Sequence, residues 1–338
     1  MSSRRLRLQW HLHSRRLQYS RRPILVGPWR SEVGFELLYW IPFLAHFTKH
    51  YRIDPARMIA IGRGGSSAWY GMAGTADLYE FLPVDAARQF SIRASQQTGS
   101  LKQHTVEGWE SHVCALTAKS LGLERYHVLS PSWLYQLVAP WWQGQQPIGW
   151  LDRWLLQPVT FPKPVIEPDV QASLPPRYIA MRWYVRATWP HKEDLLLWTR
   201  RFVESVASRI PVILIDSPLH NDDHADLNLG EIPNTRRLSE FTHQTPLNNL
   251  AIQSAVVARA QGYIGTYGGM AQGAMRWGVP TLALYDQFGQ TAPQHLQLTQ
   301  WLSLRTGVPF VACRPKDLEA LLPLVMVQRL PKENENHT

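Results

Sequence analysis

The sequence predicts an α/β protein with two domains, each a doubly wound parallel sheet, that face each other across a cleft. Short apolar runs that read as strands alternate with helical patterns of about 10–15 residues, which is typical of parallel sheets. A length of 338 residues with 45% hydrophobic content suits two cores rather than one. The alternation weakens over residues 69–129, and residues 130–176, rich in Pro and Trp, interrupt it, so we expect a loop-rich connection there.

Four segments follow from this pattern. We expect a flexible basic arm, an N-terminal Rossmann-like domain that includes the Pro/Trp-rich connection, a C-terminal Rossmann-like domain and a polar tail. These segments span residues 1–22, 23–165, 166–330 and 331–338.

The N-terminal domain begins as a strand–helix–strand unit. "PILVG" (23–27) predicts a buried strand, and "RMIAIG" (57–62) predicts a second one that ends in the turn-rich "GRGGSS". Residues 33–50 between them predict a helix. The apolar stripe of this helix comprises Leu37, Trp40, Ile41, Leu44 and Phe47.

The C-terminal domain shows a clearer alternation. The expected strands are residues 177–184, residues 211–217, and the runs "GYIGTYGG" and "PTLALYD". The expected helices are residues 194–209, 247–260 and 270–277. Strands of this length between helices indicate a parallel, doubly wound sheet.

The positive charge is confined to the start of the chain. Of the formal net charge of +9, eight arginines lie within residues 1–31, which contain no acid, so 27 basic and 26 acidic residues remain elsewhere. The arm could bind an anionic membrane surface or a phosphate backbone. It is equally consistent with a disordered solvated tail or with a start codon assigned too far upstream. The near-neutral remainder makes nucleic acid the weakest of these partners.

Several classes of protein are excluded. The arm lacks the apolar core of a secretory signal, and no run approaches the roughly 18 apolar residues of a membrane span. The two cysteines, Cys114 and Cys313, form no Cys-x-x-Cys, so neither a disulfide framework nor a zinc knuckle is indicated. We therefore expect a cytoplasmic protein that is soluble or peripheral to a membrane.

A glycine pair suggests a phosphate site in the C-terminal domain. A predicted strand ends at Gly265, Gly268 and Gly269 follow, and a helix begins at Met270, whose free N–H groups suit a phosphate. A Gly-Gly before a helix is equally typical of a tight turn. Arg182, after an earlier strand, is the expected cation, with Arg186 and Lys192 as weaker candidates for the same role.

Two acids mark the start of the helix over residues 33–50. Helical spacing places Glu32 and Glu36 on one side, with Gly34 between them leaving room for a ligand. Apolar neighbours would raise the pKa of such a carboxyl by desolvation, which suits a general base. Alternatively, the helix dipole favours acids in a first turn without any catalytic role.

Two other clusters are rejected as sites. The run "LHNDDHAD" carries the metal-ligand types His220, Asp222, Asp223, His224 and Asp226. These side chains lie in one polar loop with no recognised spacing, so we expect no metal. Ser66 and Ser67 follow "GRGG", but neither a nucleophile elbow nor a P-loop is present.

The layout resembles the two-domain GT-B glycosyltransferases, and among them the lipopolysaccharide heptosyltransferase group. The resemblance rests on a strand, a Gly-containing loop, an acid six residues before a proline (Glu36 and Pro42), and a distant strand–Gly–helix ending in "GVPTLALY". The "GPWRSEVGFELLYW" block also looks like uncharacterised glycosyltransferase-like proteins of bacterial surface-polysaccharide clusters. The chain departs from the family's Asp-Thr-Gly and helical His, with Tyr267 and Gly268 before Gly269 and Gln272 at the His position.

The resemblance implies a donor site and an acceptor site. Glu36, or alternatively Glu32, would be the catalytic base of an inverting transfer that needs no metal or other cofactor, with Arg182 and the amides of residues 268–270 neutralising the leaving diphosphate. The turn over residues 235–243 would contact the nucleotide base and ribose. Further expected contacts are Leu238 and Glu240 for the nucleoside, and Trp29, Arg30 and Gly34 on the acceptor side.

We therefore expect a glycosyltransferase that uses a nucleotide sugar and a glycan or lipid-linked acceptor to make a bacterial surface polysaccharide. The fifteen tryptophans, including Trp133, Trp141 and Trp142, suit either an acceptor groove or a packed domain interface. A non-catalytic module that binds a nucleotide or glycan, and an epimerase or hydrolase of nucleotide sugars, stay open as alternatives because a fold does not fix a reaction.

Overall fold

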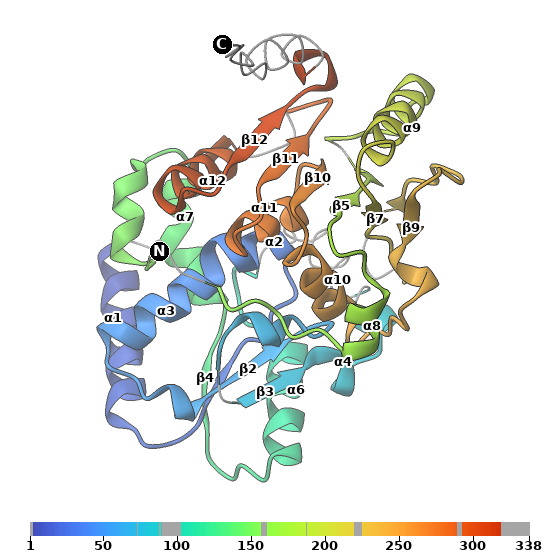
Figure 1. The fold of residues 1–338 in the computed structure, drawn as a ribbon. Coiled ribbons are helices and arrows are strands. Elements are labelled where there is room, and N and C mark those ends of the chain that lie inside the picture. Colours follow the sequence, from blue (N-terminus) through green and yellow to red (C-terminus); the bar gives the residue numbers. More distant parts are fainter. Residues whose placement is uncertain are drawn as a thin grey trace, which may run out of the picture.

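The structure is a computed structural model that describes residues 3–72, 74–87, 89, 103–156, 161–186, 188–219, 225–288 and 293–318. Its described strands form two parallel sheets, one in each half of the chain, together with a small antiparallel pair (Figure 1). The fold class expected from the sequence is therefore confirmed. The parallel sheets use residues within 24–129 and 179–313, and the exact domain boundary between them stays a prediction.

The N-terminal sheet has four strands in the order β3-β2-β1-β4. The strands are β1 (Ile24–Val26), β2 (Met58–Gly62), β3 (Gly74–Asp77) and β4 (His127–Leu129). The main helices of this half are α2 (Val33–Phe35), η1 (Glu36–Trp40), α3 (Ile41–His50), α4 (Leu78–Phe81), α6 (Gly108–Ser120) and α7 (Ser132–Trp142). Short turns lie at η2 (Pro55–Arg57), η3 (Ser66–Trp69) and η4 (Ile148–Arg153), and α8 (Pro168–Ser173) leads toward the second sheet.

The C-terminal sheet has six strands in the order β12-β11-β10-β5-β7-β9. The strands are β5 (Ile179–Arg182), β7 (Val212–Leu214), β9 (Thr235–Arg237), β10 (Gly262–Thr266), β11 (Thr281–Leu284) and β12 (Phe310–Cys313). The helical segments are α9 (Glu193–Ala207), η5 (Leu238–Glu240), α10 (Asn249–Val257), α11 (Gly269–Arg276) and α12 (Pro293–Thr306). The antiparallel pair joins β6 (Tyr184–Val185) to β8 (Ala225–Asp226).

The order of the strands reverses at an equivalent place in both sheets. Within each half, the strands that come first and fourth along the chain are neighbours, β1 with β4 and β5 with β10. From β9, the second sheet reads third, second, first, fourth, fifth and sixth, which is the doubly wound dinucleotide-binding order. Ligands of such sheets bind beyond the carboxyl ends of the strands at this reversal. A ligand site is therefore expected at the segments after β1, β5 and β10.

The basic arm is a helix rather than the flexible segment expected from its charge. Residues 3–19 form α1, whose Trp10 is 4% and Leu17 0% exposed. Trp10 lies against Phe43 and Phe47, with ring centroids 5.4 and 5.8 Å away. The apolar residues within the arginine-rich run thus form one inner face, and burial of that face orders the helix.

The Pro/Trp-rich connection also contains more helix than expected. Helix α7 buries Leu134, Leu137, Val138 and Trp141 on one side despite Pro140 near its end. The helical spacing of these residues outweighs the proline, which acts only in the last turn. Among the described residues, no helix combines the length and apolar character needed to cross a membrane.

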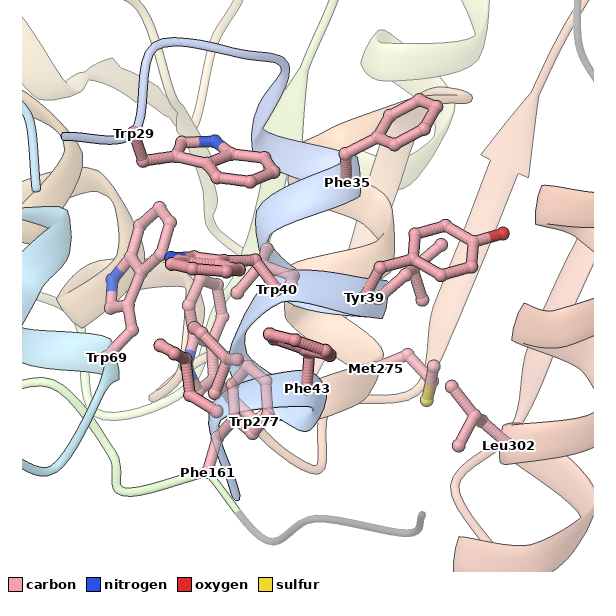
Figure 2. Close-up of a cluster of buried hydrophobic side chains, with 14 of the residues drawn as sticks. Trp29, Phe35, Tyr39, Trp40, Phe43, Trp69, Phe161, Met275, Trp277 and Leu302 are labelled. Atoms are coloured by element: carbon pink, nitrogen blue, oxygen red, sulfur yellow. The ribbon is translucent and has the colours of Figure 1, made fainter. Parts of the chain in front are cut away.

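The two halves share a buried interface. The largest hydrophobic cluster joins Trp29, Trp40 and Phe43 of the first half to Met275 and Trp277 of the second (Figure 2). The loop after β2 also reaches the other half, because the Gly64 carbonyl accepts hydrogen bonds from the Leu250 and Ala251 N–H groups at 2.9 and 3.1 Å. This loop therefore satisfies backbone donors at the N-terminus of α10.

Candidate active site

Glu36 begins a π-helical turn in the middle of the long helix. The Ile41 N–H donates to the Glu36 carbonyl, five residues back, instead of to Leu37. Pro42 has no N–H, so the Leu37 carbonyl lacks a donor within the helix. The guanidinium Nε of Arg276, on α11 of the other domain, donates to that carbonyl at 3.3 Å. A π-turn at this place matches the tendency of such turns to occur at functional sites.

The Glu36 carboxyl is fully buried and only one of its oxygens is engaged. Its Oε1 accepts hydrogen bonds from the Ser66 hydroxyl at 2.9 Å and from the Tyr70 hydroxyl at 2.6 Å. Its Oε2 is buried and has no hydrogen-bond partner among the described residues. Oε1 is thus held in place while Oε2 keeps its capacity to accept a proton or a hydrogen bond.

Burial raises the pKa of the Glu36 carboxyl from 4.5 to about 7. The positive charge of Arg63 and the hydrogen bonds from Tyr70 and Ser66 oppose this rise, because all of them favour the charged form. The sequence-based expectation of a raised pKa therefore agrees with the surroundings of Glu36. Its catalytic role stays a prediction.

This pKa makes stability depend on pH. In the unfolded chain Glu36 loses its proton near pH 4.5, whereas the folded protein keeps it up to about pH 7. The folded state binds more protons between these values, so stability falls as pH rises through that window, by at most about 3 kcal/mol. We expect Glu36→Gln to flatten this fall, measured as the difference in melting temperature between variant and wild type from pH 5 to pH 8. An identical pH dependence in both proteins would contradict a raised pKa of Glu36 in the folded state.

Glu32 has different surroundings. It precedes α2 and is exposed, and its carbonyl accepts the Glu36 N–H at 3.2 Å. The spacing argument treats the two acids alike, but only Glu36 is desolvated. The structure therefore distinguishes the two acids by burial, and which of them is the catalytic base stays a prediction.

The segment that holds Glu36 is tied to the second domain. Ser66 lies in η3, and Tyr70 follows it. In the same turn, the Trp69 indole N–H donates to the Ser254 hydroxyl of α10 at 2.9 Å. The hydrogen bonds to Glu36 therefore depend on how the two domains meet.

The N-termini of α2 and α11 lie against each other. A Cβ added to Gly269 would come within 2.8 Å of the Gly34 nitrogen and of the Val33 Cβ. A Cβ added to Gly34 would come within 2.2 Å of the Gln272 side-chain oxygen. The expected donor-side glycine Gly269 and the acceptor-side Gly34 are thus brought together, and only residues without side chains allow this approach.

Gly268 contacts the segment that carries Arg186. A Cβ at Gly268 would lie 2.1 Å from the Tyr184 hydroxyl and 3.1 Å from Arg186 Nη1. Of the residues predicted to bind phosphate, Gly268, Gly269, Met270 and Arg186 therefore gather at the N-terminus of α11. Lys192 instead pairs with Asp286, with Nζ 2.7 Å from Oδ2.

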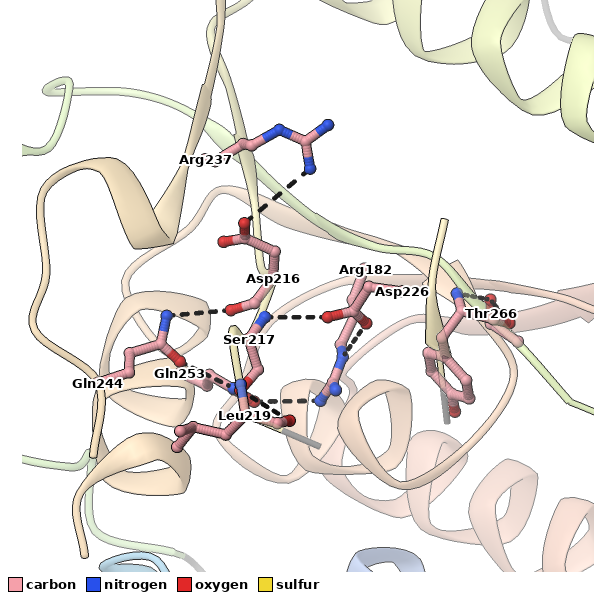
Figure 3. Close-up of polar contacts among 10 residues, drawn as sticks. Arg182, Asp216, Ser217, Leu219, Asp226, Arg237, Gln244, Gln253 and Thr266 are labelled. Atoms are coloured by element: carbon pink, nitrogen blue, oxygen red, sulfur yellow. Dashed lines mark hydrogen bonds and ion pairs between the residues drawn. The ribbon is translucent and has the colours of Figure 1, made fainter. Parts of the chain in front are cut away.

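Arg182 belongs to a polar network that joins the end of β5 to α10 and β8 (Figure 3). Its Nη1 donates to the Gln253 amide oxygen at 3.1 Å, and its Nε lies 3.4 Å from Asp226 Oδ1. Asp226 also accepts the Ser217 N–H at 2.9 Å. Arg182 is thus held at the end of β5, on the side of the sheet where ligands are expected.

The predicted nucleoside contacts differ in exposure. Leu238 is fully buried and Glu240 is exposed, so Leu238 packs in the core instead of facing a ligand through its side chain. Asp216, two residues after β7, was not among the predicted contacts; it accepts hydrogen bonds from the Ser239 N–H and hydroxyl at 2.9 and 2.6 Å. Its Oδ2 also lies 3.9 Å from Arg237 Nη1 (Figure 3). The predicted strand over residues 211–217 included this acid, whereas β7 ends at Leu214 and leaves Asp216 beyond its carboxyl end.

The expected acceptor-side residues are packed inside the first domain. Trp29 is fully buried and stacks on Trp40, with centroids 5.7 Å apart. Arg30 is buried, with Nη2 3.0 Å from Glu107 Oε1. Packing therefore accounts for both side chains, and contact with an acceptor stays a prediction.

The metal expectation is only partly covered by the structure. Within the described ranges, no three His, Cys, Asp or Glu side chains are grouped so that they could hold a metal ion. Residues 220–224 of the "LHNDDHAD" run lie outside those ranges. The absence of a metal requirement stays a prediction.

Comparisons with known proteins return structural matches alone. No protein-family model matches the chain, and no curated protein matches its sequence. The chain is similar to E. coli heptosyltransferase WaaC with ADP, at 14% identity and a TM-score of 0.44, over 89% of this chain and 99% of that one. It is also similar to a family 9 glycosyltransferase from Veillonella parvula, at 11% identity and a TM-score of 0.42, over 94% and 92% of the two chains.

A UDP-N-acetylglucosamine 2-epimerase matches as well, at 11% identity and a TM-score of 0.37, over 91% of this chain and 88% of that one. The heptosyltransferase group that the sequence layout resembles is thus among the matches. Likenesses of this strength carry no argument about activity, which has to come from the residues themselves.

Proposed function

We propose that the protein is an inverting glycosyltransferase that moves a sugar from a nucleotide sugar on the C-terminal domain to an acceptor hydroxyl on the N-terminal domain. The observation that carries the proposal is Glu36. Its buried carboxyl has a pKa near 7 and one oxygen without a partner in the described part of the chain, and its helix meets the N-terminus of α11. A group with this pKa is divided between its acid and base forms at neutral pH, as general-base catalysis requires.

The proposed step balances as a single displacement. The acceptor hydroxyl loses its proton to Glu36 Oε2 while its oxygen bonds to the anomeric carbon. The bond from that carbon to the phosphate oxygen breaks, and the nucleoside diphosphate leaves with the electron pair. The free N–H groups at the start of α11, with Arg186 and Arg182, would stabilise the negative charge on the diphosphate.

Substrate entry requires a change in the packing around Glu36. Its carboxyl exposes no surface, so the elements that cover it have to move before an acceptor reaches it. The same burial favours one alternative, a non-catalytic module in which Glu36 is structural. Only the alternative predicts that nucleotide binding occurs without any transfer.

Nucleotide binding is the first experiment. A thermal-shift screen with ADP, UDP, GDP, CMP and TDP should raise the melting temperature by several degrees for one base, because a ligand of the folded state stabilises it. Gly268→Val should remove the shift, since its side chain would occupy the space beside Tyr184 and Arg186. Gly149→Val is the matched control, because no atom of the described residues lies within 4 Å of a Cβ there. A folded wild type that responds to no nucleotide would refute the donor site.

We further propose that the acceptor is a lipid-linked or surface glycan and that the enzyme works in the cytoplasm at the inner face of the cell membrane. Helix α1 supports this location, because its exposed side is basic.

A further inference from the structure

Helix α1 exposes an apolar stripe to solvent. Leu8 is 59%, Leu12 62% and Tyr19 74% exposed. Their spacing of i, i+4 and i+11 places them along one side of the helix. They account for three of the ten large hydrophobic side chains that the described part of the chain leaves exposed, so the stripe is a local concentration.

Arginines surround this stripe. The helix and the four residues after it contain no acidic side chain. The exposed arginines are Arg4, Arg5, Arg7, Arg15, Arg16, Arg21 and Arg22. Arg15 Nη1 donates to the Tyr19 hydroxyl at 2.7 Å, which joins the charged and apolar parts of the face.

The opposite side of α1 fixes the helix to the protein. Trp10 packs on Phe43 and Phe47 as described above, and Arg57 donates to the Leu17 carbonyl at 3.0 Å. Arg57 Nε also donates to the Arg22 carbonyl at 3.0 Å. The helix is therefore formed and held before it meets a partner, which lowers the ordering cost of binding.

We propose that α1 is a docking surface for an anionic lipid bilayer, parallel to the membrane with Leu8, Leu12 and Tyr19 entering the headgroup region. Charge complementarity identifies the partner, since arginines near an anionic leaflet are attracted to it. The apolar stripe favours a bilayer over nucleic acid, because Leu side chains gain nothing from a phosphate backbone but are buried at the headgroup boundary. This inference deepens the proposed membrane-side location.

Vesicle co-sedimentation of the full-length protein tests the surface. Wild type should bind phosphatidylcholine vesicles containing phosphatidylglycerol at least about tenfold more tightly than phosphatidylcholine alone, and added salt should weaken the binding. Leu8→Gln/Leu12→Gln, which keeps every charge, should lose about tenfold or more in affinity. Arg4→Gln/Arg5→Gln/Arg7→Gln should also bind weakly. Leu197→Gln/Leu247→Gln is the matched control, because these leucines are 48% and 45% exposed outside α1.

Two outcomes would overturn the proposal. Wild type without a preference for anionic vesicles would exclude the lipid surface. A Leu8→Gln/Leu12→Gln variant that binds like wild type, with equal binding to duplex DNA, would show a general polyanion site instead. The substituted positions are exposed, so unchanged melting temperatures should accompany the loss of binding. No donor or acceptor is present in this assay, so its failure and a failure of sugar transfer are separate results.

Discussion

Replacing Glu36 by Gln is expected to lower the turnover number of sugar transfer by about 10²–10⁴-fold, the usual contribution of a general base. Glutamine has the size of glutamate but cannot accept the hydroxyl proton. Folding should be preserved, because the carboxyl already carries its proton much of the time near pH 7 and an amide resembles that neutral form. The measurement is kcat with the nucleotide sugar whose base the thermal-shift screen identifies.

Glu32→Gln is the control for this effect. Glu32 is four residues earlier and exposed, so its loss should change kcat less than about threefold, as expected for a group outside the reaction. The affinity for the nucleotide should be the same in both variants, since neither acid lies on α11. Near-wild-type turnover of Glu36→Gln with the donor bound would exclude Glu36 as the base.

Gly269→Ala is expected to cost about 1–3 kcal/mol of stability and most of the activity. The new methyl group would meet the Gly34 backbone nitrogen at 2.8 Å, and backbone cannot move aside as a side-chain end can. Gly34→Ala should be milder, because the nearest atom is the end of the Gln272 side chain rather than backbone, and the Gly269 Cα is 3.5 Å away. Chemical denaturation of both variants would measure this order.

Gly108→Ala is the matched control, since no atom in the described ranges lies within 4 Å of a Cβ at that position. If Gly269→Ala were as stable as this control, the close approach of α2 and α11 would not hold in solution. If Gly34→Ala were the more damaging change, the Gln272 side chain would be rigidly held and unable to move away from a Cβ at residue 34.

Sequence periodicity was sufficient to predict the fold class, because several strands and helices of each half carry their own pattern. Residues 58–62 and 281–284 are strands where apolar runs predicted them, and the helix over residues 33–50 is continuous. The π-turn within it was not predictable, because it combines Pro42 with an arginine of the other domain, Arg276, whose contact depends on the tertiary structure.

Helix α1 illustrates another limit of sequence reasoning. Arginine density predicted a solvated arm, whereas Trp10 and Leu17 supply an inner face. That face becomes useful only when Phe43, Phe47 and Trp133 form a surface to receive it, with Trp133 5.3 Å from Trp10 between ring centroids. Local composition cannot report such a partner.

The candidate site was partly predictable. The spacing from strand to helix predicted that Gly268 and Gly269 lie at the start of a helix. The apolar neighbours of Glu36 predicted its desolvation. The partners of Glu36, Ser66 and Tyr70, could not be found this way, since they lie about 30 residues along the chain and come close only through the turn after β2. The pairing of Lys192 with Asp286, far along the chain, was likewise not visible in the sequence.

The pH dependence of kcat/KM for sugar transfer tests the central claim most directly. If Glu36 is the base, activity should rise with pH through an ionisation near pH 7, where its carboxyl loses its proton. Tyr70→Phe removes the 2.6 Å hydrogen bond that favours the charged carboxylate, so the rise should move to higher pH in this variant. A rise that stays at the same pH in Tyr70→Phe would contradict the assignment of Glu36 as the catalytic base.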